Sequence, residues 1–233
     1  QCLVGSEMCI RDSIVTLEDP VEYHIPGVSQ CQINEKTGMT FASGLRAILR
    51  QDPDIISVGE IRDGETASIA MRAAITGHLV FSTLHTNDAV SAVYRLKDVG
   101  VEPWLVASAL RGVVSQRLLR KVCPHCKKGY QPSAEELALL GMPEDSHVTF
   151  YKGEGCPECH HSGYTGRRAA FEILMLSGRL RRLISEGASE ERLTEEARKN
   201  GFRSMRESCR RLVLEGVTSA EEAARIINTT VDE

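Results

Sequence analysis

The sequence predicts an α/β protein with a mostly parallel β-sheet and helices on both faces, followed by a four-cysteine zinc module and a C-terminal helical bundle. Three observations support this prediction. Apolar runs typical of buried strands alternate with segments of helical period from residue 13 onward. Two Cys-x-x-Cys pairs follow. After them, apolar residues recur every three to four positions toward the C-terminus.

The first half of the chain alternates strand and helix patterns. Strands are expected at 14–17, 54–61 and 79–84, and helices at 41–50, 64–76 and 88–99, where Gly100 ends the last helix. A connection rich in Gly and Pro joins the first strand to the first helix. Helical crossovers favour a parallel sheet, and such a sheet binds its ligand at the carboxyl ends of its strands.

Polar residues gather at those carboxyl ends. They are Glu18, Asp19 and Glu22 after the first strand, Glu60, Arg62 and Asp63 after the second, and His85, Thr86 and Asn87 after the third. A carboxylate in such a place loses hydration at a cost on the order of several kcal/mol, which favours a task or a partner for it. Asp63 and Asp88 could instead cap helices, and a lone strand-end histidine is more often structural. Three clusters together favour a site for phosphate and Mg2+, where Glu60 would orient or deprotonate an attacking water.

Composition and charge indicate an ordinary globular chain. Its 233 residues are 42% hydrophobic and 26% charged, and the net charge of -4 argues against sequence-independent binding to nucleic acid. The basic runs at 117–121 and 179–182 are expected to be solvated faces. The sequence has no apolar stretch long enough for a membrane span and does not open like a secretory signal, so we expect a cytoplasmic protein.

Residues 1–12 show no regular period. They resemble a translated sequencing adapter, so we expect a poorly ordered, non-native leader. An unusual native terminus is the alternative.

Cys123, Cys126, Cys156 and Cys159 have the spacing of two zinc knuckles. The 29-residue spacer between the pairs is long for a zinc ribbon. The extra length costs only roughly 0.5 kcal/mol of loop closure, whereas structural zinc contributes on the order of 10 kcal/mol. The spacer contains a predicted helix at 133–140 that opens with a Ser133/Glu136 capping box.

Disulfides are the competing interpretation of these cysteines, and a cytoplasmic location argues against them. The neighbouring histidines are expected to be exposed non-ligands, and the remaining cysteines to be free thiols: His125, His160, His161, Cys31 and Cys209. Further helices are expected at 179–186, 189–200, 204–214 and 219–228, with Gly201 and Gly216 at their ends.

Several stretches resemble motifs of the secretion ATPases that power type II secretion and type IV pilus assembly. TLEDPVEY (16–23) resembles the Asp box, LRQDPDIISVGEIRD (49–63) the Walker B region and TGHLVFSTLHTN (76–87) the His box. GYTGRRAAFEIL (163–174) and SMRE (204–207) also fit the family, and the resemblance extends over about residues 13–230.

The resemblance implies a partial RecA-like ATPase core at 13–120, a tetracysteine zinc module at 121–165 and a C-terminal helical subdomain at 166–233. It implies ATP, Mg2+ and Zn2+ as cofactors. Glu60 would be the catalytic Walker B acid, Glu18 the acid near Mg2+ and water, and His85 the phosphate-sensing histidine, with Arg62 in the same catalytic group. Nucleotide binding or contacts between subunits would involve Glu18 together with Asp19, Glu22, Arg46, Arg50 and Arg167.

The resemblance also implies a homo-hexamer that binds inner-membrane platform proteins of a secretion or pilus system. It would bind no nucleic acid and would reach the membrane only through those partners. The zinc module distinguishes the chain from retraction ATPases.

One departure from the family is important: no G-x-x-x-x-G-K-[ST] phosphate loop occurs in the sequence. We therefore expect no measurable ATP hydrolysis from this polypeptide alone. Two alternatives remain at this stage, a zinc-containing metabolic α/β enzyme and a zinc-dependent nucleic-acid-binding module.

Overall fold

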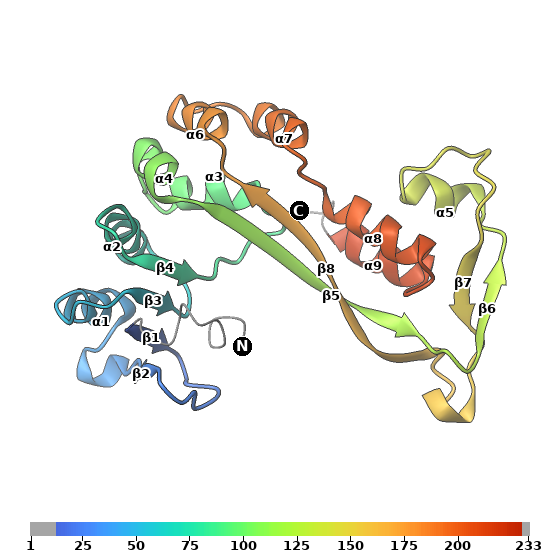
Figure 1. Ribbon diagram of the computed structural model, residues 1–233, viewed down its shortest axis with the longest axis horizontal. Helices are drawn as coiled ribbons and strands as arrows, with labels where there is room; N and C mark the ends of the chain where they lie inside the picture. Colours follow the sequence, from blue (N-terminus) through green and yellow to red (C-terminus); the bar gives the residue numbers. More distant parts are fainter. Residues whose placement is uncertain (1–12, 230–233) are drawn as a thin grey trace. The chain divides into compact units, whose positions relative to one another are not determined.

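A computed structural model describes residues 13–229 (Figure 1). The expected non-native leader at 1–12 lies outside the described residues. Contacts divide the chain into two compact units. Unit 1 contains the described residues up to Thr86 with Val90–Arg111 and Leu176–Glu196, and unit 2 contains Asn87–Ala89, Gly112–Met175 and the described residues from Ala197 onward.

Unit 1 contains a four-stranded sheet in the order β2-β1-β3-β4, and every neighbouring pair is parallel. Its strands are β1 (Ile14–Glu18), β2 (Ser29–Gln32), β3 (Ile55–Val58) and β4 (Leu79–Ser82). The parallel sheet confirms the predicted α/β class. β2 lies within the predicted connection, and its polar sequence, SQCQ, carries no strand pattern. β4 was expected to be buried, but it is an edge strand of the described sheet, so Leu79 is 47% and Phe81 37% exposed.

The helices of unit 1 are α1 (Phe41–Ile48), α2 (Gly64–Ile75), α3 (Ser91–Asp98), α4 (Pro103–Ala109) and α6 (Gly178–Ser185), with a short 3-10 turn, η1 (Glu35–Thr37). α1, α2, α3 and α6 begin close to the predicted positions, whereas α4 and η1 were not predicted. The side chain of Asp63 caps α2 by accepting from the Thr66 N–H at 2.8 Å. Asp63 therefore has the capping role that we considered as its alternative. Asp88 is not the cap of α3, because that helix begins at Ser91 with Val90 at its N-cap.

Unit 2 is built on a long antiparallel pair, β5 (Gly112–Val122) and β8 (Tyr164–Met175) (Figure 1). A second antiparallel pair, β6 (Lys127–Tyr130) and β7 (Phe150–Gly153), accompanies α5 (Ala134–Leu139) and the 3-10 turn η2 (Pro157–Cys159). The helices α8 (Met205–Leu214) and α9 (Ala220–Thr229) pack on β8 and β5 respectively. α7 (Glu190–Lys199) runs from unit 1 into unit 2.

The core of unit 2 joins residues distant in sequence, including Leu119, Phe150, Cys209 and Leu212, each 0–2% exposed. The predicted capping box of α5 is confirmed, because Ser133 and Glu136 exchange both of its hydrogen bonds. The prediction that residues 117–121 form a solvated face is wrong for two of them. Leu119 is fully buried, and Arg120 forms an ion pair with the buried side chain of Glu222. Among residues 13–229, no helix combines the length and apolarity that a membrane crossing requires.

Candidate nucleotide and metal sites

Hydrogen bonds connect the residues at the carboxyl ends of β1, β3 and β4, an edge of the sheet that we call the rim. The Gly59 N–H donates to the Leu17 carbonyl at 2.8 Å, and the Ile61 N–H donates to the Thr83 carbonyl at 3.0 Å. The Thr83 hydroxyl donates to the Gly59 carbonyl at 2.6 Å. Residues that follow β3 are therefore held between the ends of β1 and β4, as expected for neighbouring strands of a parallel sheet.

Glu60 is the centre of this rim. Arg62 donates to its Oε1, and the Nε2 atom of His85 lies 3.3 Å from its Oε2. The Glu60 side chain is 14% exposed, whereas those of Arg62 and His85 are 61% and 88% exposed. The sequence thus correctly placed these three residues near one another.

Glu60 and Arg62 stabilise each other's charged forms. The hydrogen bond from Arg62 is the main cause that lowers the pKa of Glu60, against the opposing effect of burial. The same bond raises the pKa of Arg62, with smaller contributions from Asp19 and Glu35. Asp19 is therefore close enough for its charge to act on Arg62. Glu60 is ionised at neutral pH and can accept hydrogen bonds or a proton.

Glu18, the last residue of β1, is held by two donors. The Thr16 hydroxyl donates to Glu18 Oε1 at 2.6 Å, and the amide of Gln30 donates to the same oxygen at 2.8 Å. The Gln30 amide also donates to the Tyr23 carbonyl at 2.8 Å, so it fastens the loop that follows β1. Sequence reasoning missed Gln30, because nothing in a polar stretch indicates which side chain turns toward an acid on the neighbouring strand.

The other candidate residues are more dispersed. Glu22 and Arg50 are exposed. Arg46 forms an exposed ion pair with Glu65 at the start of α2. Arg167 belongs to unit 2, where it lies opposite Arg120 in the β5–β8 ladder. In the described part of the chain, Glu60 forms its side-chain hydrogen bonds and ion pairs with Arg62 and His85 and with none of these four residues.

In unit 2, the four candidate cysteines come together. The Sγ atoms of Cys123, Cys126, Cys156 and Cys159 all lie within 4.8 Å of one another. Three of the separations are 3.9, 3.9 and 3.7 Å. Four sulfurs about 2.3 Å from a central zinc stand about 3.8 Å apart at the corners of a tetrahedron, so the cluster fits Zn2+. A disulfide would need about 2.05 Å, and the described cysteines are free thiols.

Backbone donors shape this cluster. The N–H groups of Cys156 and Gly163 each lie 3.2 Å from the Cys159 sulfur. Burial opposes the thiolate of Cys159, but these two N–H groups help to lower its pKa to about 6. A Cβ atom on Gly153 would stand 2.1 Å from the Gly163 carbonyl oxygen, and Gly163 has a φ of +77°. His125, His160 and His161 are exposed and lie outside the four-thiol cluster, as expected.

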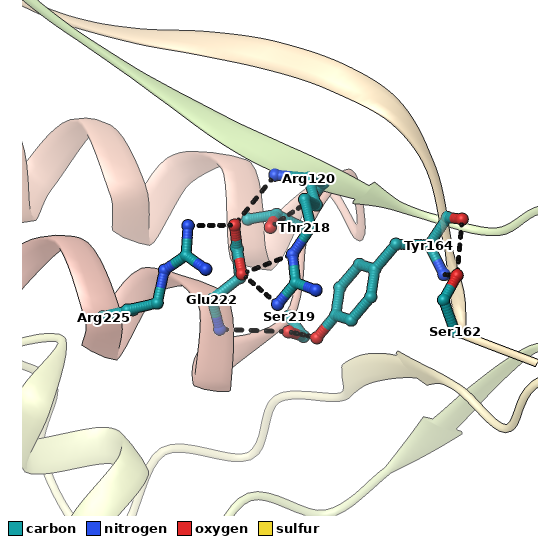
Figure 2. A network of polar contacts seen from close by, with 7 residues as sticks. All are labelled: Arg120, Ser162, Tyr164, Thr218, Ser219, Glu222 and Arg225. Atoms are coloured by element: carbon teal, nitrogen blue, oxygen red, sulfur yellow. Dashed lines mark hydrogen bonds and ion pairs between the residues drawn. The ribbon is translucent and has the colours of Figure 1, made fainter.

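A polar network ties the strand that leaves the second cysteine pair to α9 (Figure 2). The Tyr164 hydroxyl lies 2.7 Å from the Ser219 hydroxyl, and Ser219 accepts from the Glu222 N–H at 3.2 Å. The Arg120 guanidinium stacks 4.2 Å from the Tyr164 ring centre and donates to Glu222 at 2.9 and 2.6 Å. Arg225 adds a further contact to Glu222 at 3.4 Å. The network therefore links the cysteine cluster to the C-terminal helix of the described chain.

Comparison with solved structures identifies the class of protein. The structure of the pilus retraction motor PilT with bound ADP matches with a TM-score of 0.66 and 31% identity, over 92% of this chain and 52% of that chain. The ATPase DotB of Legionella pneumophila matches with a TM-score of 0.66 over 97% of this chain and 54% of that chain, and at 22% identity it supports the fold alone. The fold is thus that of secretion and pilus ATPases.

The chain belongs to the Type II/IV secretion system protein family, whose model matches residues 6–225. The type II secretion system protein E of Pseudomonas aeruginosa is 51% identical over 214 residues, which are 92% of this chain and 42% of the relative. The type IV pilus assembly ATPase PilB of Thermus thermophilus is 52% identical over 209 residues, which are 89% of this chain and 24% of the relative.

This chain spans less than half the length of the curated relatives that it matches. The predicted family is confirmed. Neither alternative, the metabolic enzyme or the nucleic-acid-binding module, finds support among the relatives.

Proposed function

We propose that this chain supplies the acid and histidine rim of an ATP hydrolysis site in a motor for type II secretion or type IV pilus assembly. The observation that carries the proposal is the position of Glu60 between Arg62 and His85, at the carboxyl ends of β3 and β4. A general base near a phosphoryl group requires such placement, and the relatives named as ATPases indicate the reaction.

Glu60 acts as the base. A water oxygen attacks the terminal phosphorus of ATP, the bond to the leaving ADP oxygen breaks, and a proton of the water passes to the Glu60 carboxylate. Each Glu60 oxygen already accepts one contact. His85 is the weaker and more exposed partner, so it leaves Glu60 to contact the terminal phosphate while Arg62 offsets the charge of the transferred group.

Glu18, Asp19 and Glu22 hold Mg2+ directly or through water. Both donors to Glu18 approach Oε1, so among the described residues Oε2 is available for this task. The ion supplies neutralisation of phosphate charge when bound. Arg46, Arg50 and Arg167 bind nucleotide or act at boundaries between subunits of a homo-hexamer.

The four cysteines hold Zn2+ in a closed structural site that takes no part in the reaction. We assign residues 13–120 to a RecA-like core, 121–165 to the zinc module and 166–233 to a helical subdomain for subunit packing. The protein works in the cytoplasm, binds no nucleic acid and reaches the inner membrane only through platform proteins of the secretion or pilus system.

A chimera tests this proposal, because the sequence contains no phosphate loop. The part of the Pseudomonas aeruginosa relative that this chain does not match is joined to residues 13–233. The parent chimera should hydrolyse ATP, and Glu60→Gln should lower kcat by at least about 10²-fold. Glu135→Gln, an exposed residue of α5, is the matched control. A Glu60→Gln chimera that hydrolyses ATP at the parent rate contradicts the proposal.

A further inference from the structure

The three residues Asn87–Ala89 belong to unit 2, although they follow His85 and Thr86 of unit 1 directly in the chain. Two residues of the β5–β8 pair hold them there. Arg117 on β5 donates from Nη2 to the Asn87 carbonyl at 3.2 Å. Glu172 on β8 accepts a hydrogen bond from the Ala89 N–H. The segment Asn87–Ala89, which begins two residues after His85, therefore forms hydrogen bonds with both β5 and β8.

Glu172 is an unusual residue for its position. It is only 4% exposed, and its Oε2 atom is buried with no hydrogen-bond partner. Its inward-facing neighbours on β8 are Ala170 and Leu174, at 2% and 3% exposure. An apolar side chain would fill this place without the cost of burying a carboxyl group. The acid thus contributes something other than packing, and its hydrogen bond to Ala89 is the contact that an apolar residue could not make.

The charged groups around Glu172 come from three elements. Asp88 lies on the segment Asn87–Ala89, Arg117 on β5 and Glu207 on α8. Burial is the main cause that raises the pKa of Glu172 to about 7, with Asp88 and Glu207 acting in the same direction and Arg117 in the other. The carboxyl group therefore changes charge near neutral pH while it holds the Ala89 N–H.

We propose that Arg117 and Glu172 are positioning residues for hydrolysis: they clamp Asn87–Ala89 and so fix where the chain delivers His85. The inference rests on the proposed role of His85 and extends it to two residues that touch neither substrate nor Glu60. The clamp acts on the path of the backbone, because its contacts are to the Asn87 carbonyl and the Ala89 N–H. Loosening it lowers the fraction of molecules in which His85 is placed for the reaction, which affects kcat more than substrate affinity.

Hydrogen exchange on the 233-residue chain tests the clamp without reference to ATP. Peptides that cover residues 84–90 should exchange at least about tenfold faster in Arg117→Met and Glu172→Leu than in the parent. Glu172→Gln keeps an oxygen acceptor and should retain most of the protection, and Arg117→Lys should be intermediate. Glu135→Gln is the control. Unchanged protection in Arg117→Met overturns the clamp, and this variant decides the matter even where Glu172→Leu fails to fold.

Kinetics in the chimera test the positioning role. Arg117→Met should lower kcat at least about tenfold while KM changes less than about twofold, with partial rescue by Arg117→Lys. Glu172→Gln should remove an inflection near neutral pH from the kcat profile. Faster exchange with an unchanged kcat overturns the positioning role. A parent chimera without activity counts against the proposed function instead, and the exchange comparison then decides the clamp by itself.

Discussion

The parent protein should lose free energy of unfolding as pH rises through neutrality, and Glu172→Gln should abolish that loss. The pKa of Glu172 is raised from 4.5 to about 7, chiefly by burial. Because the folded state binds this proton more tightly than the unfolded state, the contribution of Glu172 to stability falls as pH rises through this window. At about 1.4 kcal/mol for each tenfold change in proton affinity, the full effect is ~3 kcal/mol, and about 2 kcal/mol of it falls between pH 5.5 and 8.0. Gln has no charge to bury, so the variant gains stability relative to the parent over that interval.

Urea denaturation of both proteins at a series of pH values measures this difference, with Zn2+ present throughout. Glu191→Gln is the matched control. A hydrogen bond from Ser189 lowers the pKa of Glu191, so its contribution is lost only as pH falls below about 4.5. The control should therefore show a constant difference from the parent between pH 5.5 and 8.0. The reasoning is refuted if the difference in free energy of unfolding between Glu172→Gln and the parent stays constant within about 0.5 kcal/mol over this interval, or shrinks with rising pH.

Three further predictions concern the zinc cluster, the buried ion pair and the reaction. Native mass spectrometry should find one Zn2+ per chain, lost in Cys126→Ser; a metal-free chain whose four cluster thiols are all readily alkylated would show that the cluster is not a zinc site. Arg120→Met should lower the free energy of unfolding by about 3 kcal/mol, because the carboxylate of Glu222, whose side chain is 0% exposed, loses its main partner. Replacing both residues by Met should recover part of that loss in urea titrations, and a double variant no more stable than Arg120→Met would argue against this account. The 233-residue chain alone should release no phosphate from ATP in a coupled assay, and phosphate release that disappears in Glu60→Gln would contradict this expectation.

Local patterns predicted the elements whose signals lie within a single segment. The helix at 41–50 appears as α1 (Phe41–Ile48), and the capping box of Ser133 and Glu136 forms as expected. β5 and β8 were missed for a physical reason. Each strand pairs with the other across more than forty residues of intervening chain, without a tight turn to mark the pairing. Their charged residues also obscure the alternation that typifies a half-buried strand.

The positions of residues at the rim were predictable from the strand order, but the directions of their side chains were not. The rule that parallel strands end at one edge brings Glu60 and His85 together from their positions alone. That rule does not say which way a long side chain turns. Arg62 turns onto Glu60, whereas Arg46, a candidate from the family resemblance alone, pairs with Glu65. Gln30 and Glu172 needed the packed structure, because their importance comes from neighbours distant in sequence.

The close approach of Gly153 and Gly163 makes these codons unusually intolerant of change. Every missense mutation of a glycine codon adds at least one carbon atom, and at Gly153 that carbon would meet a carbonyl oxygen 2.1 Å away. Neither residue offers a side chain to a metal, yet both should be as sensitive to inherited change as the thiols they support. A survey of random variants that scored only residues with functional groups would overlook them.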